Sequence, residues 1–319
     1  MHYDWLGTYQ DYPEKLPVLK GKQWMLRDTD TGEELFTSQS FSHKGSYSTS
    51  IAIRVKGNRL VVSGNPSRYG RIDNVFGYSN LDACYDVYNE ILESLGLPPL
   101  TKGTRVWHLQ GEDGKKVQTC SDGAIVTELH VTENRAVGGG AVDQYIKAVS
   151  GLPYRHLIGN LAPNGKTAQW LSKTGKARLL HSSVYDKANQ IRLFHLPKVK
   201  RVFGVDSEEY RYLLKVVEYC EIEGVARFEQ KLKSEFLERL RCRYYGLFDE
   251  SLLRPVHEAF LSIDNTLKVN SMRIESIADV LLRENIVGTV RAANTTAFYA
   301  IEWMHGKTFD LSKRQLQTH

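Results

Sequence analysis

Hydrophobic and polar residues alternate along much of the first third of the chain, which is the pattern of strands that bury one face. The alternation is weak at the start and clearest between residues 47 and 64, where Lys56-Gly57-Asn58 supplies the turn of a hairpin. The predicted strands are residues 3–10, two strands within 22–38, the hairpin 47–64, 104–110, 124–134, 167–172, 177–187 and the first half of 225–242. Because isolated strands are unstable, we expect a common sheet.

A repeat of apolar positions with a helical period marks the other elements. Residues 80–96 place one apolar set on a single face: Leu81, Cys84, Tyr88, Ile91, Leu92 and Leu95. This helix is expected to begin near Asn80 and to end at Gly96, which precedes a Pro-Pro pair. Further helices are predicted in 141–151, 206–224, the second half of 225–242 and throughout 251–319, whereas a linker is predicted around Pro197.

The order of these elements indicates the fold class. Strands and helices follow one another without a strict strand-helix-strand repeat, and the strand pair 167–172 and 177–187 is joined by a predicted turn at 173–176. We therefore expect an α+β fold in which a central antiparallel sheet is covered by helices. A boundary is predicted at 250/251, so that 1–250 form one domain and 251–319 a helical C-terminal module.

Composition narrows the class of protein without naming a function. The 319 residues are 41% hydrophobic and 25% charged, which is typical of a globular protein. The net charge of +5 and the pI near 8.8 suit a polyanionic partner but do not establish one. Four cysteines lie far apart, and no targeting or membrane segment is apparent, so we expect a reducing cytoplasm.

Several common catalytic motifs are missing from the sequence. It contains neither GxxxxGK[ST] nor GxGxxG after a strand, so ATP- or NAD-driven chemistry has no support. It also contains neither GxSxG nor HExxH, so hydrolases of the classes that carry those motifs are excluded as functions.

Three predicted strands carry polar side chains two residues apart, so that each set shares one face of its strand. The sets are Glu128, His130 and Thr132; Tyr185 and Lys187; and Arg227, Glu229 and Lys231. Imidazole and carboxylate groups together can hold Mg²⁺ or Mn²⁺, which would polarise a phosphate. A tyrosine with a pKa near 10 attacks such a phosphate only with help from a base, a cation or a metal. A structural histidine and a solvated charged strand are the commoner explanations of the same spacing.

Five stretches, in order along the chain, resemble one family. They are YDWL at 3–6, GNPSRYGRIDNVFGYSNLD at 64–82, TELHVTEN at 127–134, VYDKANQ at 184–190 and ARFEQKLKS at 226–234. The set resembles the gene II-type replication initiators of filamentous bacteriophages, and within them the branch that includes the cholera toxin phage initiator. The end of the chain, with AFYAIEWMHGK at 297–307, is similar to the family's helical C-terminal module, which continues further in relatives. We therefore expect the chain ending at His319 to be truncated or shortened.

The resemblance implies an HUH-type endonuclease that nicks and rejoins one strand of origin DNA in the cytoplasm of a bacterial host. It implies a 5′-phosphotyrosine intermediate, Mg²⁺ or Mn²⁺ as cofactor, and a host helicase and polymerase as partners. The residues carried over are Tyr185 and Lys187 as catalytic and His130 and Glu229 as metal ligands, and Glu128 joins the predicted ligand set because it shares the strand face of His130. The predicted DNA-binding residues are Arg68, Arg71, Arg227, Lys231 and Lys233. Binding through phosphates predicts that affinity falls as salt rises.

Three positions depart from the family pattern. His130 stands where relatives have Asp, Glu128 where they have Arg, and Gln190 where they have Glu. An amide can orient a neighbour but cannot act as a base or strong ligand. A non-catalytic DNA-binding replication regulator with the same fold is therefore the alternative, and a plasmid or transposon relative is a third.

Overall fold

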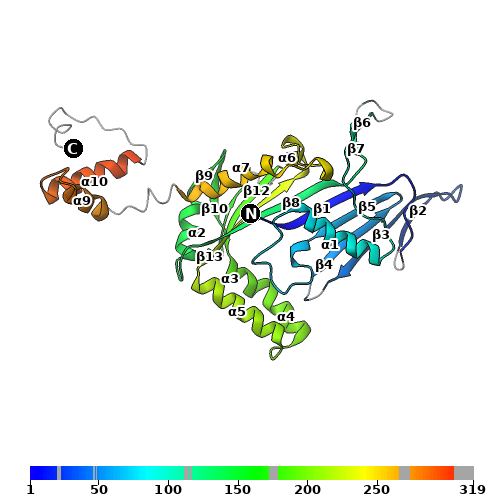
Figure 1. Cartoon of the computed structure of the whole chain (residues 1–319), viewed down its shortest axis with the longest axis horizontal. Helices are drawn as coiled ribbons and strands as arrows, with labels where there is room; N and C mark the ends of the chain where they lie inside the picture. The colour runs from blue at the N-terminus through cyan, green and yellow to red at the C-terminus, as the bar shows by residue number, and fades with distance from the viewer. Residues whose placement is uncertain are drawn as a thin grey trace. The chain divides into compact units, whose positions relative to one another are not determined.

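The structure is a computed structural model, and it describes residues 1–19, 23–45, 47, 49–110, 114, 117–171, 179–265 and 274–304. The chain divides into two compact units, Met1–Leu261 and Ser262–His319, which are described separately. The first unit is built on an eleven-stranded sheet (Figure 1). Every predicted site residue belongs to this unit.

The strands of this sheet are all paired antiparallel with their neighbours. From edge to edge they are β2 (Gln23–Arg27), β3 (Glu34–Lys44), β4 (Ser50–Lys56), β5 (Arg59–Gly64), β1 (His2–Asp11), β8 (Ile125–Ala136), β13 (Val225–Lys233), β12 (Leu180–Asp186), β11 (Thr167–Trp170), β10 (Leu157–Leu161) and β9 (Pro153–Tyr154). The predicted α+β fold with an antiparallel sheet is confirmed. The predicted turn at 173–176 lies outside the described residues.

One face of the sheet is apolar and packs against helices. Leu6, Leu129 and Leu232 are cross-strand neighbours on β1, β8 and β13, and they share a core with the apolar side of α1 (Leu81–Ser94). On the same face Phe260 of α7 (Glu250–Leu261) contacts Phe228, with ring centroids 5.4 Å apart. Because side chains alternate along a strand, the polar residues between these apolar ones point to the opposite face.

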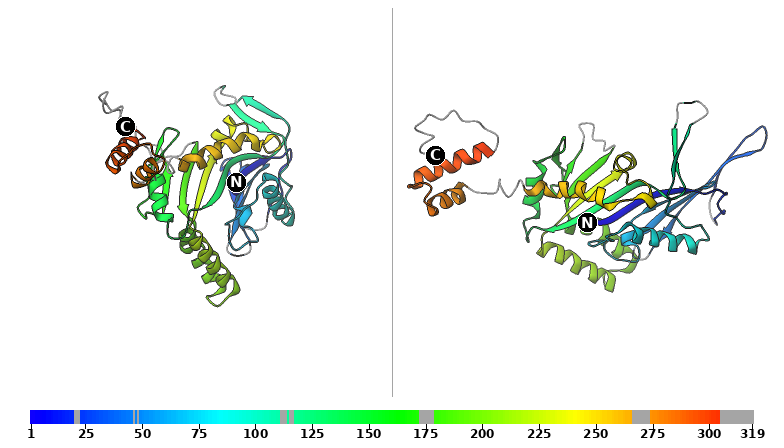
Figure 2. Two further views of the ribbon diagram at one scale, coloured as in Figure 1. Left: turned by 60° about the vertical axis from the view of Figure 1, so that its left-hand side comes forward. Right: turned by 45° about the horizontal axis from the view of Figure 1, so that its top comes forward.

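The remaining elements of the first unit are short or peripheral. They are η2 (Pro66–Arg68), α2 (Val142–Ser150), α3 (Lys187–Gln190), the π-helical turn η3 (Ile191–His195), α4 (Leu196–Phe203), α5 (Glu208–Ile222), α6 (Ser234–Arg239) and η4 (Tyr245–Leu247). The pair α4 and α5 extends away from the sheet (Figure 2).

The segment around Pro197 is a helix, so the predicted linker is wrong. α3, η3 and α4 follow one another without a break, and Pro197 lies in the first turn of α4. Proline is tolerated there because the first backbone N–H groups of a helix have no intrahelical acceptor. The π-helical turn just before it is a local irregularity that no periodicity of apolar residues signals.

The predicted strand 104–110 does not join the large sheet. It forms β6 (Val106–Gln110), which pairs with β7 (Val117–Ser121) as a separate two-stranded ribbon. Trp107, Leu109 and Val117 of this ribbon are exposed, so the large sheet does not cover these apolar side chains. The expectation of one common sheet is therefore wrong for this strand.

The second unit contains η5 (Ser262–Asp264), α9 (Ile274–Arg283) and α10 (Val290–Met304). Ala278 of α9 packs with Ala293 and Ala297 of α10. The predicted boundary at 250/251 falls after the first residue of α7, whereas the first unit extends to Leu261 because Leu253 and Phe260 of α7 are buried in it. Residues 305–319 lie outside the described part. Among the helices that the structure describes, none has both the length and the apolar character needed to cross a bilayer.

Candidate active site

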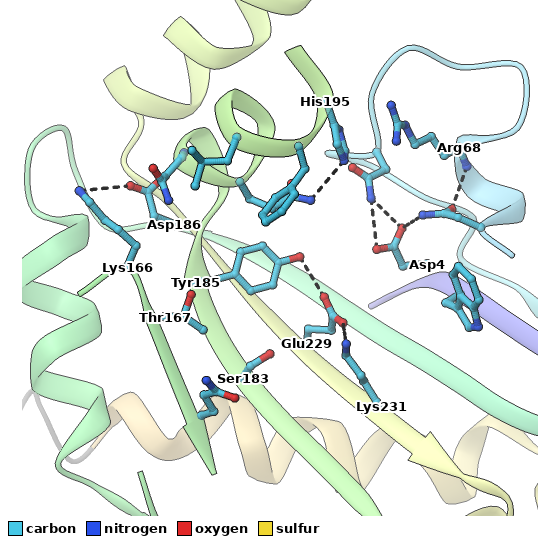
Figure 3. A pocket seen from close by; sticks show the side chains of 18 of the residues that line it. Asp4, Arg68, Lys166, Thr167, Ser183, Tyr185, Asp186, His195, Glu229 and Lys231 are labelled. Carbon is cyan, nitrogen blue, oxygen red and sulfur yellow. Dashed lines mark hydrogen bonds and ion pairs between the residues drawn. The ribbon is translucent and has the colours of Figure 1, made fainter. Parts of the chain in front are cut away.

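A polar cavity of about 550 Å³ lies on the sheet face opposite α7 (Figure 3). Its floor comes from β1, β11, β12 and β13, and its walls include the 65–74 loop, η3 and the first turn of α4. The floor is polar because these strands alternate, with apolar side chains in the core behind it. The residues that contribute polar groups to it are therefore set by strand register.

Register brings three predicted site residues together. β12, β13 and β8 are adjacent, and Glu229 lies opposite Ser183 on one side and Thr132 on the other. The Tyr185 hydroxyl donates a hydrogen bond to Glu229 Oε2 at 2.9 Å. Glu229 Oε1 lies 3.3 Å from His130 Nδ1. Tyr185, Glu229 and His130 thus form a continuous polar chain across three strands.

The pKa values of Tyr185 and Glu229 are shifted in opposite directions. Burial and the negative charge of Glu229 raise the pKa of Tyr185 well above its usual value. Burial disfavours the Glu229 carboxylate, but hydrogen bonding and charge from His130 outweigh this and lower the pKa of Glu229. Glu229 is therefore ionised at neutral pH and accepts the phenol hydrogen bond, while Tyr185 keeps its proton in the absence of substrate.

His130 is held between two carboxylates. Its Nε2 lies 2.8 Å from Glu128 Oε1, on the other side of the ring from Glu229. Burial opposes the charged ring, yet the hydrogen bonds to both carboxylates raise the pKa of His130. The hydrogen bond with His130 is the largest cause that lowers the pKa of Glu128 to about 2. Trp5 stacks on the imidazole with ring centroids 5.9 Å apart.

Two of the three predicted metal ligands, His130 and Glu229, are placed so that they can hold one metal ion, whereas Glu128 is not. Glu128 and Glu229 contact different ring nitrogens, and the described residues contain no cluster of three or more His, Cys, Asp or Glu side chains suited to a metal. His130 Nδ1 and Glu229 Oε1, 3.3 Å apart, do fit as neighbouring ligands, since octahedral ligands about 2.1 Å from Mg²⁺ are about 3 Å apart. Mg²⁺ usually completes such a partial site with water and substrate phosphate.

Lys187 lies beneath the cavity, fully buried at the start of α3. Its Nζ donates to Asn74 Oδ1 at 2.8 Å and to Gln190 Oε1 at 3.1 Å. Burial, followed by the positive charge of Arg227, lowers the pKa of Lys187 to about 7. Lys187 therefore ties α3 to the 65–74 loop, and its predicted catalytic role stays a prediction.

The lowered pKa of Lys187 makes the free energy of unfolding depend on pH. Between about pH 7 and 10.5 the unfolded chain holds a proton that folded Lys187 has released, so stability should rise with pH there. Relative to Lys187→Met, the natural protein should gain up to about 1.4 kcal/mol of unfolding free energy per pH unit. Urea unfolding at about pH 6, 8 and 9.5 measures this difference. A difference that stays constant across these values contradicts the shift.

Arg227 is also buried, which argues against its predicted contact with DNA. Only 1% of its side chain is exposed, and its Nη2 lies 3.2 Å from Asp4 Oδ2 and donates to Thr132 Oγ1 at 2.9 Å. Asp4 in turn accepts hydrogen bonds from Asn65 at 2.7 Å and from Asn74 at 2.9 Å. This network joins β1, β13 and the 65–74 loop, and no pattern in the sequence marks Asp4 as part of it.

The other predicted DNA-binding residues differ in position. Arg68 and Lys231 line the cavity, and Lys231 Nζ lies 3.5 Å from Glu229. Lys233 is half-buried and pairs with Glu128 at 2.7 Å, while Arg71 does not line the cavity. Trp5, Lys166, Phe194 and His195 also line the cavity, and no pattern in the sequence predicted a role for them. Phe194 and His195 come from the helical segment that was expected to be a linker, which explains why no role was predicted.

Comparison with known proteins gives the family. The chain is 48% identical over 269 residues to the replication-associated protein of Escherichia phage If1, a match that covers 84% of each chain. A rolling-circle replication initiator from Geobacillus stearothermophilus aligns with 75% of this chain and 76% of its own, at 11% identity and a TM-score of 0.26, a likeness too weak to support an argument. No family model matches. The chain belongs to the family of filamentous-phage replication-associated proteins, which confirms the resemblance to the gene II-type initiators.

Proposed function

We propose that this protein initiates rolling-circle replication by nicking and later rejoining one strand of phage origin DNA, with Tyr185 as the nucleophile. The observation that carries the proposal is the hydrogen bond from Tyr185 to an ionised Glu229, beside His130, in a polar cavity of a phage replication protein. An HUH-type arrangement of the sheet and a helical C-terminal module are parts of the same proposal.

The proposed reaction exchanges one phosphodiester for another. The Tyr185 oxygen forms a bond to phosphorus, the bond from phosphorus to the 3′ oxygen breaks, and the proton lost by the phenol is balanced by one gained at the 3′ hydroxyl. Glu229 orients the phenol by accepting its hydrogen bond. Because the phosphotyrosine conserves the bond energy for rejoining, the reaction needs no ATP, in agreement with the missing nucleotide motifs.

A divalent cation, Mg²⁺ or Mn²⁺, is proposed as cofactor, with His130 and Glu229 as its protein ligands. Bound there, it would polarise the scissile phosphate and make phosphorus easier to attack. The His130 and Glu229 side chains are 12% and 10% exposed, and Trp5 stacks on the imidazole. Glu128 is not included among the proposed ligands because it holds the opposite ring nitrogen and Lys233.

Single-stranded or locally melted origin DNA is the proposed substrate. Lys166, Lys198 and Lys231 line the cavity and can neutralise phosphates, while Trp5 and Phe194, 37% and 59% exposed, offer faces on which bases can stack. The 3′ hydroxyl left by the nick is a primer end, so a host polymerase and helicase are the expected partners, in the cytoplasm of the bacterial host.

The direct test is formation of a covalent protein–DNA adduct. The protein is incubated with single-stranded origin oligonucleotides and Mn²⁺ and then separated under denaturing conditions. We expect an adduct that Tyr185→Phe abolishes. Tyr212→Phe is the matched control, since the Tyr212 hydroxyl also donates to a carboxylate, that of Asp73, at 2.9 Å. An adduct that survives in Tyr185→Phe contradicts the assignment of the nucleophile.

The alternative is a DNA-binding replication regulator that does not cut. Gln190 favours it, because this amide stands where relatives have Glu and is already engaged by Lys187 and by His195, 3.2 Å away. Salt-sensitive binding of origin DNA without an adduct, for any origin sequence and with either metal, would establish the alternative and exclude the nicking activity.

A further inference from the structure

One end of the cavity contains two buried side chains whose polar atoms lack partners. Arg68 is 8% exposed and His195 is 5% exposed, and both line the cavity. Within the described ranges of the chain, Nε and Nη2 of Arg68 and Nδ1 of His195 have no hydrogen-bond partner. Figure 3 shows the two side chains pointing toward one another, on the far side of the cavity from the Tyr185–Glu229 pair.

Unpartnered groups of this kind call for a ligand. A buried donor left without an acceptor costs about 1–3 kcal/mol, and more when it is charged, so native proteins rarely keep two such groups side by side. The nearby carboxylates do not fill the gap. Asp4 is engaged by Arg227, Asn65 and Asn74, and Asp73 accepts from Tyr212.

The charges around the site select an anion. Arg68 presents two guanidinium nitrogens, and Lys198 lines the same wall of the cavity. Burial and then the positive charges of Arg68, Lys187 and Lys198 lower the pKa of His195 to about 2, so the ring is neutral. Because the Gln190 amide nitrogen can only donate, His195 Nε2 accepts from it and Nδ1 carries the ring proton as a donor. Two parallel N–H donors of a guanidinium match two oxygens of a phosphate.

We infer that Arg68 and His195 form a second phosphate subsite, which binds a phosphodiester of the same DNA strand next to the scissile one. This inference rests on the proposed function, because that function supplies the DNA strand as the substrate. The scissile phosphate must reach the Tyr185 oxygen, so a group bound between Arg68 and His195 is a different phosphate. Holding a strand at two phosphates fixes which bond faces Tyr185, which makes Arg68 and His195 positioning residues for the choice of nick.

The structure explains how the sequence builds this subsite. Arg68 ends the short helix η2, which Asn65 caps by accepting from the Arg68 N–H at 3.0 Å. His195 ends the π-helical turn η3, and its Nε2 is fixed by Gln190 at 3.2 Å. A glutamate at position 190 would add a negative charge next to this phosphate, so Gln190 suits the subsite.

The test uses deoxythymidine 3′,5′-bisphosphate, a small probe with two phosphates, and the full chain with ¹⁵N-labelled histidine rings, without metal. We expect the probe to shift the His195 ring signal, which is assigned by its loss in His195→Gln. Arg68→Gln should weaken binding by about ten- to a hundredfold, because it removes charge-assisted hydrogen bonds. Arg68→Lys, which keeps the charge but loses the two parallel N–H donors of the guanidinium, should recover only part of the affinity.

Controls distinguish a loss of the subsite from a loss of folding, and the failure of this inference from the failure of the proposed nicking. Arg192→Gln is the matched control, since Arg192 lies on the same π-helical turn but pairs with Glu221 at the surface. Thermal unfolding checks that each variant is folded. An unmoved His195 signal, full affinity in folded Arg68→Gln, or equally tight binding of inorganic phosphate overturns the strand subsite. If the bisphosphate shifts His195 but no adduct forms in the nicking assay, the subsite stands and the proposed nicking fails.

Discussion

Replacing Glu229 with glutamine should lower the rate of adduct formation with origin DNA at least about a hundredfold. The Glu229 carboxylate both accepts the Tyr185 hydrogen bond and lies 3.3 Å from His130 Nδ1, as the proposed second metal ligand. A neutral amide keeps the size of the side chain but loses the charge that a divalent cation requires. Single-turnover adduct formation in Mn²⁺ measures the rate, and salt-dependent DNA binding should change little.

Glu128→Gln is the matched control for this variant. Glu128 also contacts His130, at 2.8 Å, but through the other ring nitrogen, and it pairs with Lys233. We expect a reduction of no more than about tenfold, because Glu128 only orients the ring. Equal losses in the two variants would contradict a site built on one carboxylate and would restore the three-ligand set expected from the sequence.

Asp4→Asn should lower the free energy of unfolding by about 3–5 kcal/mol, because it leaves a buried guanidinium without its counter-ion. Arg227 is 1% exposed, and Asp4 Oδ2, 3.2 Å from its Nη2, is its ion-pair partner. The same carboxylate holds Asn65 and Asn74, so the wall of the cavity should loosen as well. Urea unfolding measures the first effect, and faster amide exchange in residues 65–74 measures the second.

A surface pair on the same strand provides the comparison. Asp11 binds Arg59 through two hydrogen bonds of 2.6 and 2.7 Å, but the two side chains are 29% and 35% exposed. Solvent screening limits such a pair to about 1 kcal/mol or less, so Asp11→Asn should be mild. If Asp4→Asn is equally mild, the Asp4–Arg227 network does not organise the site as described.

The sequence predicted the elements with strong local signals. The helix 80–96 is confirmed as α1, which starts after Asn80, whose side chain accepts from the Ala83 N–H at 2.7 Å. The strand of Tyr185 and the strand of Glu229 were also predicted, and alternation alone placed Glu229 and Lys231 on one face. These features depend on periodicity within one segment, which a sequence displays directly.

Features that depend on long-range packing were not predictable in this way. Asp4 is a single acidic residue in the first strand, and nothing near it in sequence indicates that it meets Arg227. Arg227 and Lys231 alternate identically along β13, yet one is buried and the other lines the cavity. The difference arises from the 65–74 loop, whose Asn74 carbonyl accepts a hydrogen bond from Arg227 at 2.5 Å. Similarly, strand spacing placed Glu128 on the face of His130, and the family resemblance added Glu229, but neither specified which ring nitrogen each carboxylate contacts.

The most direct test of the central claim is the identity of the tyrosine that carries DNA. The adduct formed in Mn²⁺ is digested with protease and nuclease, and the peptide that retains a nucleotide is sequenced by mass spectrometry. The protein has seventeen tyrosines, so the result discriminates sharply. We predict a single modified peptide with the nucleotide phosphate on Tyr185. A nucleotide on any other tyrosine, with Tyr185 unmodified, would contradict the account.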